Sequence, residues 1–280
     1  FIGSTLTLEL QSRWPKSEIV VVDDFRSGDF KNLEGFRGDV VAKNVVDYHP
    51  ARPFDLIFHL ASITDTTVHD QRLMVHDNVE GFRNVLGLGR CVVYASSAAT
   101  YGIASEPMRE DRSPAPANIY AFSKVILDNL GRGKAIGLKF FNVYGPREAH
   151  KKAASSMIYQ LAVQMRSGKQ PRLFKHGEQK RDFVYVKDVV QATIHAAEKG
   201  KPGLYNVGSG QARSFNDIIA ALNASLGLSL KPEYFDNPYD YYQPFTEADI
   251  AKAKRELGYA PRFSLESGVA DYMKELGWQH

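Results

Sequence analysis

The segment Ile119-Tyr120-Ala121-Phe122-Ser123-Lys124 places a tyrosine and a lysine four residues apart in a stretch that suits a helix. On a helix, this spacing puts both side chains on one face. A free tyrosine has a pKa of about 10, and a neighbouring ammonium group favours the phenolate and lowers that pKa. The pair is therefore typical of a site that moves a proton on or off a hydroxyl group.

An apolar run at 91–95 precedes this segment and predicts a buried strand that leads into Ser96 and Ser97. The Ser97 hydroxyl, placed at the strand end, can hydrogen-bond the same substrate oxygen as Tyr120. Because the chain has 14 tyrosines and 35 lysines and arginines, some matches to this spacing arise by chance, and Tyr48 with Arg52 is one of them. The strand ending in serines and the Asn-x-Tyr start of the helix distinguish Tyr120 from that background.

Apolar runs at 18–23, 54–62, 91–95, 135–143 and 204–208 predict buried parallel strands separated by helical segments. We predict an α/β fold, a doubly wound parallel sheet of the Rossmann type with a smaller C-terminal substrate-binding domain. Residues 1–145 plus 183–208 are expected to form the dinucleotide-binding domain. Residues 146–182 plus 209–280 are expected to form the substrate domain.

The start of the sequence, Phe1-Ile2-Gly3-Ser4, leads directly into a helical pattern. A dinucleotide-binding unit begins with a strand and a glycine-rich turn, of which Gly3 would be the last glycine. We expect the first strand and most of that turn to precede Phe1. We also expect residues to be missing near 45–53, 87–90 and 131–134, where the connections are short for parallel strands.

Two acidic residues, Asp23 and Asp24, end the first predicted strand about twenty residues after Gly3, where an acid meets the adenosine ribose. The alternative is that they only start a loop. Arg26 follows and can accommodate a 2′-phosphate, which favours NADP over NAD. The segment Leu60-Ala61-Ser62 ends the next strand with small residues that let the backbone approach a cofactor. His59, just before it, is predicted to be a satisfied core histidine.

The composition excludes several classes of function. A net charge of +3 is too small to indicate nucleic-acid binding and agrees with a local anionic ligand such as a diphosphate. With one cysteine, Cys91, no intramolecular disulfide can form, which favours a reducing compartment. No apolar run approaches the roughly 18 residues of a membrane helix, and no metal-ligand cluster is visible. We therefore expect a cytoplasmic protein without a metal site or membrane contact.

Three blocks of sequence resemble the extended short-chain dehydrogenases/reductases that act as nucleotide-sugar epimerases and dehydratases: 96–102 (Ser-Ser-Ala-Ala-Thr-Tyr-Gly), 120–124 (Tyr-Ala-Phe-Ser-Lys) and 140–148 (Phe-Phe-Asn-Val-Tyr-Gly-Pro-Arg-Glu). The blocks 180–186 and 242–249 are most similar to the ADP-L-glycero-D-manno-heptose 6-epimerases. The resemblance runs from Phe1 to about Tyr272.

This resemblance implies inversion of C6″ in an ADP-heptose-type nucleotide sugar by transient oxidation with bound NADP, with NAD as the other possibility. It also implies a homo-oligomer that acts in lipopolysaccharide core biosynthesis. Lys151 takes the position of a second catalytic base, whereas without the resemblance a solvated loop lysine is the simpler interpretation. Lys124 is expected both to hold the cofactor ribose and to lower the pKa of Tyr120.

The remaining site residues also come from the resemblance. Cofactor contacts are implied for Phe1, Ile2, Gly3, Asn78 and Val143, and substrate contacts for Asn142, Ala153, Gln160, Phe174, Arg181 and Tyr242. The family has a small polar residue at the position of Ala153 and a histidine at the position of Gln160. These two departures affect the expected sugar-hydroxyl contacts and not the reaction type.

Two other functions remain open. The first is a nucleotide-sugar 4-epimerase or 4,6-dehydratase, although a dehydratase needs an acidic pair just after the active-site hydroxyl, where this chain has Ala98 and Ala99. The second, from another class, is a non-catalytic NAD(P)-binding sensor module. The presence of Ser97, Tyr120 and Lys124 argues against a sensor, which has no need of all three.

Overall fold

A computed structural model describes residues 1–64, 70–236 and 243–279. The α-helices are α1 (Ile2–Arg13), α2 (Gln71–Leu86), α3 (Ile119–Leu130), α4 (Met157–Arg166), α5 (Val186–Lys199), α6 (Phe215–Leu226), α7 (Ala251–Leu257) and α8 (Leu265–Glu275). The strands are β1 (Val20–Asp23), β2 (Asp39–Ala42), β3 (Phe54–His59), β4 (Gly89–Ser97), β5 (Ile136–Phe140), β6 (Asn142–Tyr144), β7 (Arg172–Phe174), β8 (Lys180–Tyr185), β9 (Gly203–Val207), β10 (Ala212–Ser214) and β11 (Glu233–Phe235). The short 3₁₀ helices are η1 (Phe30–Leu33), η2 (Val45–Asp47), η3 (Ala98–Tyr101), η4 (Ala149–Ala154) and η5 (Lys175–Gly177).

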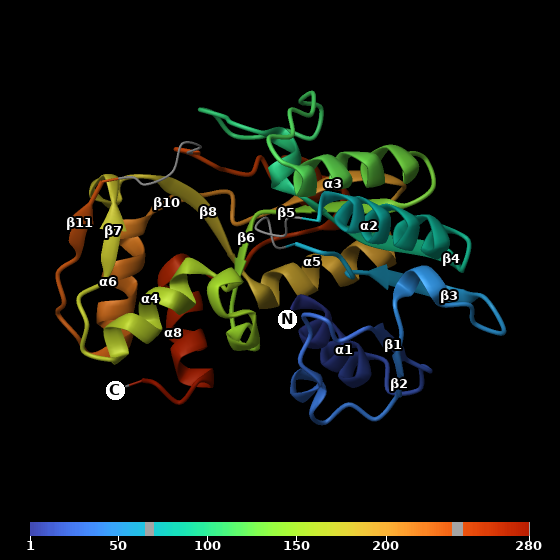
Figure 1. Cartoon of the computed structure of the whole chain (residues 1–280), viewed down its shortest axis with the longest axis horizontal. Coiled ribbons are helices and arrows are strands. Elements are labelled where there is room, and N and C mark those ends of the chain that lie inside the picture. Colours follow the sequence, from blue (N-terminus) through green and yellow to red (C-terminus); the bar gives the residue numbers. More distant parts are fainter. Residues whose placement is uncertain (65–69, 237–242, 280) are drawn as a thin grey trace.

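A four-stranded parallel sheet of order β3-β4-β5-β9 forms the centre of the fold. Its strands are apolar because both faces are covered, and every residue of β5 is buried. Helices α2 and α3 pack on one face and α5 on the other, with α1 against α5 (Figure 1). This arrangement confirms the predicted α/β fold with a parallel sheet of the Rossmann type.

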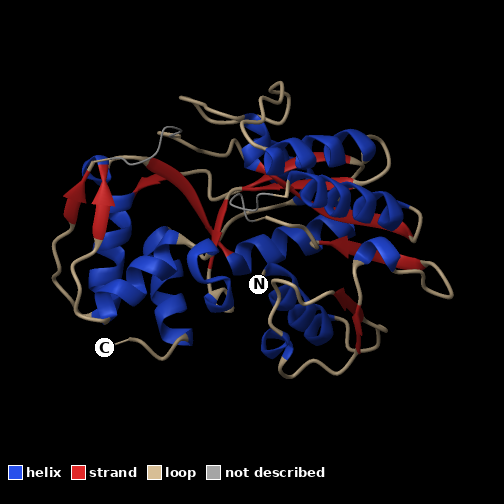
Figure 2. Cartoon of the chain, in the orientation of Figure 1, coloured by secondary structure: helices blue, strands red, loops and turns tan. Residues whose placement is uncertain are grey.

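The later segments form a second group of elements. Helices α4, α6 and α8 lie beside the small strands β7, β10 and β11, on the left in Figure 2. Strand β8 pairs with β6 in parallel and with β10 antiparallel, so a three-stranded sheet joins this group to the end of the central sheet. The predicted domain boundaries at residues 145/146, 182/183 and 208/209 remain a prediction, and β8 crosses one of them.

The strand predicted over 135–143 is in fact two strands. The backbone N–H of Phe141 donates to the Val207 carbonyl at 3.1 Å, between the end of β5 and the start of β6. From Asn142 onward the chain pairs with β8 instead of β4 and β9. The break therefore moves the chain from the central sheet to the three-stranded sheet, toward the segment that carries Lys151.

The connection from β2 to β3 contains η2 in place of an α-helix. Strands β1 and β2 pair with each other in parallel, separately from the central sheet. The Asn84 side chain of α2 donates to the carbonyls of Val45 and Tyr48, each at 2.9 Å, which satisfies this irregular backbone. Since β2 and β3 do not pair, a short connection suffices here.

Candidate active site

The end of β4 and the first turn of α3 bring Ser97 and Tyr120 together. Ser97 is the last residue of β4 and lies opposite Phe140 of β5. The Asn118 side chain accepts a hydrogen bond from the Ala121 N–H at 2.8 Å, which starts α3 at Ile119 and places Tyr120 in its first turn. The Ser97 side chain acts on the hydroxyl of Tyr120 and lowers its pKa. A substrate hydroxyl can therefore meet both groups at one point.

Lys124 lies one turn further along α3 and is buried, with 1 % of its surface exposed. Its Nζ donates to the Ala95 carbonyl at 2.8 Å and lies 5.8 Å from the centroid of the Tyr120 ring. Burial lowers the pKa of Lys124 to about 8, and the charge of Asp128 opposes this shift. At neutral pH the lysine therefore keeps its charge beside the tyrosine.

The pKa of Tyr120 differs from the expectation. Burial raises it above the ordinary value of 10, and the Ser97 side chain lowers it by less. The spacing of Tyr120 and Lys124 in the sequence predicted that they are neighbours, but it did not predict how deeply Tyr120 is buried. Burial disfavours the phenolate more strongly than Ser97 favours it. In this structure Tyr120 is therefore a neutral phenol at neutral pH.

A buried polar network behind Lys124 escaped the sequence analysis. Lys139 of β5 donates to Asp128 of α3 and to the Thr100 hydroxyl, each at 2.6 Å, and the Tyr94 hydroxyl donates to Asp128 at 3.1 Å. Its one signal in the sequence is a lysine inside an apolar strand. The network fixes α3 against β4 and β5, and Tyr94, Asp128 and Lys139 line part of a cavity of about 390 Å³.

The predicted residues of the glycine turn gather at the start of α1. Phe1, Ile2, Leu60 and Val143 pack against one core cluster, and a Cβ placed on Gly3 would meet the Leu60 side chain at 3.7 Å. The exposed Ala61 and the half-buried Ser62 follow directly after β3. The elements thus bring α1, the end of β3 and β6 to one place, as a cofactor backbone would require.

Asn78 of α2 hydrogen-bonds the backbone of Ile63, the residue after Ser62. Its side chain accepts from the Ile63 N–H at 2.7 Å and donates to the Ile63 carbonyl at 3.1 Å and to the Ser123 hydroxyl at 3.0 Å. Ser123 in turn donates to the carbonyl of Tyr120 at 2.7 Å. The buried Asn78 therefore connects the predicted cofactor loop to the helix that carries Tyr120.

The acidic pair at the end of β1 is fixed by local hydrogen bonds. Asp23 accepts from the Phe25 N–H at 2.8 Å and Asp24 from the Arg26 N–H at 3.0 Å. The Arg26 guanidinium pairs with Asp24 at 2.6 Å and with Asp77 of α2 at 2.7 Å. A 2′-phosphate would therefore have to replace carboxylate partners that Arg26 already has.

The predicted substrate residues are spread over several elements. Asn142 on β6 and Arg181 on β8 lie on neighbouring strands, and the Asn142 side chain accepts from the Thr246 hydroxyl at 3.4 Å. Phe174 of β7 packs edge-on against Phe235.

The two positions that depart from the family lie together. Gln160 of α4 donates to the carbonyls of Ala153 and Ser155 at 3.1 and 2.8 Å, so its amide holds the loop. Tyr242 lies outside the described residues.

Lys151 lies on η4 and is half-buried. Its Nζ lies 5.6 Å from the centroid of the Phe1 ring, so it extends toward the start of α1. Burial lowers its pKa, and the charge of Glu148 opposes that shift. This placement differs from that of a freely solvated loop lysine.

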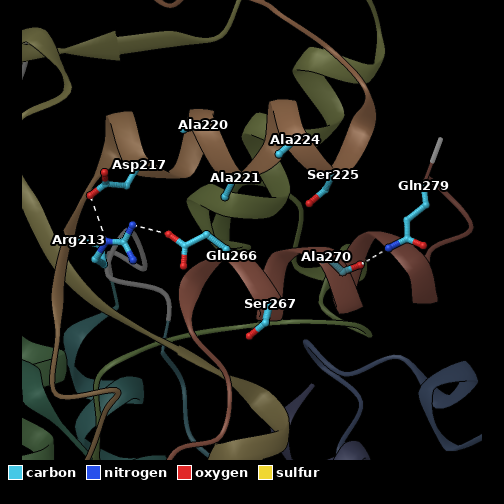
Figure 3. A pocket seen from close by; sticks show the side chains of 10 residues that line it. All are labelled: Arg213, Asp217, Ala220, Ala221, Ala224, Ser225, Glu266, Ser267, Ala270 and Gln279. Carbon is cyan, nitrogen blue, oxygen red and sulfur yellow. Dashed lines mark hydrogen bonds and ion pairs between the residues drawn. The ribbon is translucent and has the colours of Figure 1, made fainter.

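A groove of about 700 Å³ lies between α6 and α8 and contains none of the predicted site residues (Figure 3). Its charged groups satisfy one another, since the Arg213 guanidinium pairs with Asp217 at 3.2 Å and with Glu266 at 2.5 Å. We therefore do not assign the chemistry to this groove.

His59 differs from its prediction: it is buried, but its Nε2 has no hydrogen-bond partner among the described residues. Over residues 1–64, 70–236 and 243–279, no group of three or more His, Cys, Asp or Glu side chains could hold a metal ion. In the same part of the chain, no helix has the length and apolar character needed to cross a membrane.

Residues 1–208 match the model of the NAD dependent epimerase/dehydratase family. The chain belongs to this family. Among solved structures, the ADP-L-glycero-D-manno-heptose-6-epimerase of Helicobacter pylori is 39% identical with a TM-score of 0.92, and the match covers 99% of this chain and 93% of that one. The predicted family and fold are thereby confirmed.

Two other solved family structures are similar. The UDP-glucose 4-epimerase of Thermotoga maritima, with UDP-glucose, is 25% identical with a TM-score of 0.88, covering 99% of this chain and 96% of that one. The UDP-glucuronic acid 4-epimerase of Bacillus cereus, in complex with UDP-glucuronic acid and NAD, is 25% identical with a TM-score of 0.84 and the same two coverages. These relatives act on nucleotide sugars.

Proposed function

We propose that this chain inverts C6″ of ADP-D-glycero-D-manno-heptose to give the L-glycero epimer, in lipopolysaccharide core biosynthesis. The observation that carries the proposal is the 39% identity to the Helicobacter pylori 6-epimerase over 99% of the chain, joined to the convergence of Ser97, Tyr120 and Lys124. We further propose a cytoplasmic homo-oligomer, as the family resemblance implies.

We propose NADP as the cofactor, with NAD as the alternative. The place where α1, the end of β3 and β6 converge supports this proposal: a Cβ on Gly3 would meet only the Leu60 side chain, at 3.7 Å, and Asp23 ends β1 about twenty residues later. Phe1, Ile2, Gly3, Leu60, Ala61, Ser62, Asn78, Lys124 and Val143 would hold it, with Asp23, Asp24 and Arg26 at the adenosine end. When bound, the nicotinamide supplies reversible hydride transfer.

The side chains then move the proton. Ser97 orients the C6″ oxygen by its hydroxyl, and Tyr120 takes or returns the hydroxyl proton in one half-reaction. Lys151 serves as the base in the other half-reaction, because the oxygen lies on a different side once the sugar has turned about its C5″–C6″ bond. Lys124 supplies the positive charge that favours the Tyr120 phenolate and holds the cofactor ribose. Asn142, Ala153, Gln160, Phe174, Arg181 and Tyr242 are proposed to contact the substrate.

The substrate proposal is tested by offering purified protein three sugars separately: ADP-D-glycero-D-manno-heptose, UDP-glucose and UDP-glucuronic acid. NMR of the products is expected to show inversion at C6″ of the ADP-heptose and no 4-epimer of either UDP sugar. Turnover of a UDP sugar without turnover of the ADP-heptose would instead establish a 4-epimerase. Mass spectrometry of the gently denatured protein identifies the bound cofactor, and a bound dinucleotide without turnover of any of the three sugars would indicate the non-catalytic sensor module.

A further inference from the structure

Glu148 is a carboxylate with 0% of its surface exposed, three residues before Lys151. Burial of a carboxylate is costly unless hydrogen bonds satisfy its oxygens. The residue follows the end of β6 and precedes η4. The loop that starts at Glu148 carries Lys151, the proposed second base. The hydrogen-bond partners of Glu148 therefore bear on the position of that lysine.

Four donors from three parts of the chain converge on this carboxylate. Its Oε1 accepts from the Gly145 N–H at 3.2 Å, the Ser156 hydroxyl at 2.7 Å and the Tyr272 hydroxyl at 3.2 Å. Its Oε2 accepts from the Ser156 N–H at 2.5 Å. Gly145 follows β6, Ser156 caps α4 and Tyr272 lies on α8, so Glu148 fastens both ends of the loop 145–156 and ties them to α8.

The loop between these ends has a shape that its sequence would not adopt alone. Arg147 and Lys152 have φ angles of 76° and 49°, which cost of order 1 kcal/mol or more for residues with a side chain. A second tie holds the outer side, where Arg147 donates to the Asn32 carbonyl at 2.9 Å and Asn32 donates to the Arg147 carbonyl at 3.0 Å. These fixed points hold Lys151 over the Phe1 ring.

The charge of Glu148 acts on Lys151 in addition to the hydrogen bonds that fix the loop. The titratable groups that face Lys151 are Glu148 and His150, both on its own loop. Burial lowers the pKa of Lys151 and Glu148 raises it, whereas Lys151 lowers the pKa of His150. Without Glu148, the pKa of the buried lysine would be lower and no carboxylate would face its ammonium group.

We propose that Glu148 is the positioning residue for Lys151: its carboxylate fixes the loop 145–156 and supplies the negative charge that balances the lysine ammonium. The inference rests on the proposed function, since it requires Lys151 to act as the second base. Glu148 itself is buried among its donors and does not touch the substrate.

The test compares Glu148→Gln, Lys151→Met and the double variant, with Tyr272→Phe as the matched control. Glu148→Gln keeps the size of the side chain and removes its charge, whereas Tyr272→Phe removes one donor and leaves the charge. We expect Lys151→Met to lower kcat by about 100-fold or more and Glu148→Gln by roughly tenfold at nearly constant KM. Adding Glu148→Gln to Lys151→Met should then change kcat little, since the first acts through the second. Tyr272→Phe should stay within about threefold of the unaltered protein.

A second readout does not depend on activity. The rate at which Lys151 is acylated, followed by mass spectrometry across a pH series, reports the titration midpoint of that amine. We expect the midpoint to move to lower pH in Glu148→Gln and to stay in place in Tyr272→Phe. Should Glu148→Gln fold poorly, Ser156→Ala removes a donor from the loop and leaves the charge, so it should lower kcat without moving the midpoint.

The two proposals fail in different ways. Normal turnover in Lys151→Met would overturn the second base and, with it, the positioning role. A strong loss in Lys151→Met combined with normal turnover in Glu148→Gln would overturn the positioning role alone. An unmoved midpoint in Glu148→Gln, or losses that multiply fully in the double variant, would overturn it as well.

Discussion

Burial shifts three groups of the candidate site in one direction, toward their neutral forms. It raises the pKa of Tyr120, lowers that of Lys124 to about 8 and lowers that of Lys151. Opposing charges from Asp128 and Glu148 limit the two lysine shifts. At each lysine, burial lowers the pKa and a nearby carboxylate raises it, Asp128 for Lys124 and Glu148 for Lys151. This opposition suits groups that must exchange protons near neutral pH.

The buried ammonium of Lys124 should reduce stability. Its pKa is about 8 in the folded chain and 10.5 ordinarily, so its cost is fully present below pH 8 and fades as the pH rises from 8 to about 10.5. We expect Lys124→Met to raise the free energy of unfolding at pH 7 by about 2 kcal/mol. This gain is smaller than the pKa shift alone implies, because the variant loses the hydrogen bond to the Ala95 carbonyl. The advantage should shrink by pH 9.5, while turnover falls by orders of magnitude.

Urea unfolding at pH 7 and pH 9.5 measures this difference. A variant less stable than the unaltered protein at pH 7 would show that the hydrogen bond of Lys124 outweighs its desolvation.

The cofactor preference is tested at Arg26. NADP offers this guanidinium a 2′-phosphate, and NAD does not, so Arg26→Ala should weaken NADP binding by about tenfold and NAD binding little. Arg26 is already paired with Asp24 and Asp77. The loss of NADP affinity therefore measures how far the 2′-phosphate replaces these carboxylates as the partner of Arg26. Arg52→Ala, which removes an exposed arginine paired with Glu18, is the control for net charge. Equal losses for the two dinucleotides, measured by calorimetry, would leave no reason to prefer NADP.

Local spacing explains what could be predicted at the residue scale. Tyr120 and Lys124 share a helix and Ser97 ends the preceding strand, so the sequence alone places them together. The partners of Glu148 could not be predicted, because Tyr272 is 124 positions away along the chain. Asp128 and Lys139 are only 11 positions apart, but they lie on a helix and a strand whose packing the sequence pattern did not specify.

At the element scale, the apolar runs predicted the strands of the central sheet, while their ends depended on packing. The sequence pattern is continuous over 135–143, yet the chain changes sheets at Phe141. Apolar character reports burial and not the identity of the neighbouring strand, so this break was not visible. The connection from β2 to β3 also differs from the helix that parallel strands usually require. It contains only η2, and Asn84 satisfies the carbonyls of this connection.

The turn from β6 into the loop 145–156 depends on Gly145. Its φ is 145°, and a Cβ there would lie 2.6 Å from the Val186 side chain. We expect Gly145→Ala to lower the free energy of unfolding by about 2–4 kcal/mol through strain and overlap. Gly87→Ala is the control, since Gly87 has a φ of −89° and its added Cβ would approach the Asn84 carbonyl at 3.4 Å.

Chemical denaturation of both variants measures the contrast. The account of the turn would be contradicted if Gly145→Ala were as stable as Gly87→Ala, or if turnover were unaffected despite a displaced loop.

At the scale of the whole molecule, the sheet order explains why residues from distant segments share one site. The carboxyl ends of β3, β4 and β5 lie at one edge of the parallel sheet, and ligands of such sheets bind at that edge. Leu60 follows β3, Ser97 ends β4 and Val143 follows β5, so topology alone gathers them. The proposed substrate residues come from β6, β8 and the second group of elements, whose placement the sequence pattern did not specify.

The central claim is that the carbon is inverted by transient oxidation and not by proton exchange. Removal of the C6″ hydrogen as a proton would need an adjacent carbonyl to stabilise the carbanion, and C6″ of an ADP-heptose has none. A hydrogen held on a nicotinamide does not exchange with water during turnover. The most direct test is turnover of ADP-D-glycero-D-manno-heptose in heavy water, with NMR and mass spectrometry of the product. We predict an inverted product without deuterium at C6″, and one deuterium per turnover at C6″ would contradict the mechanism.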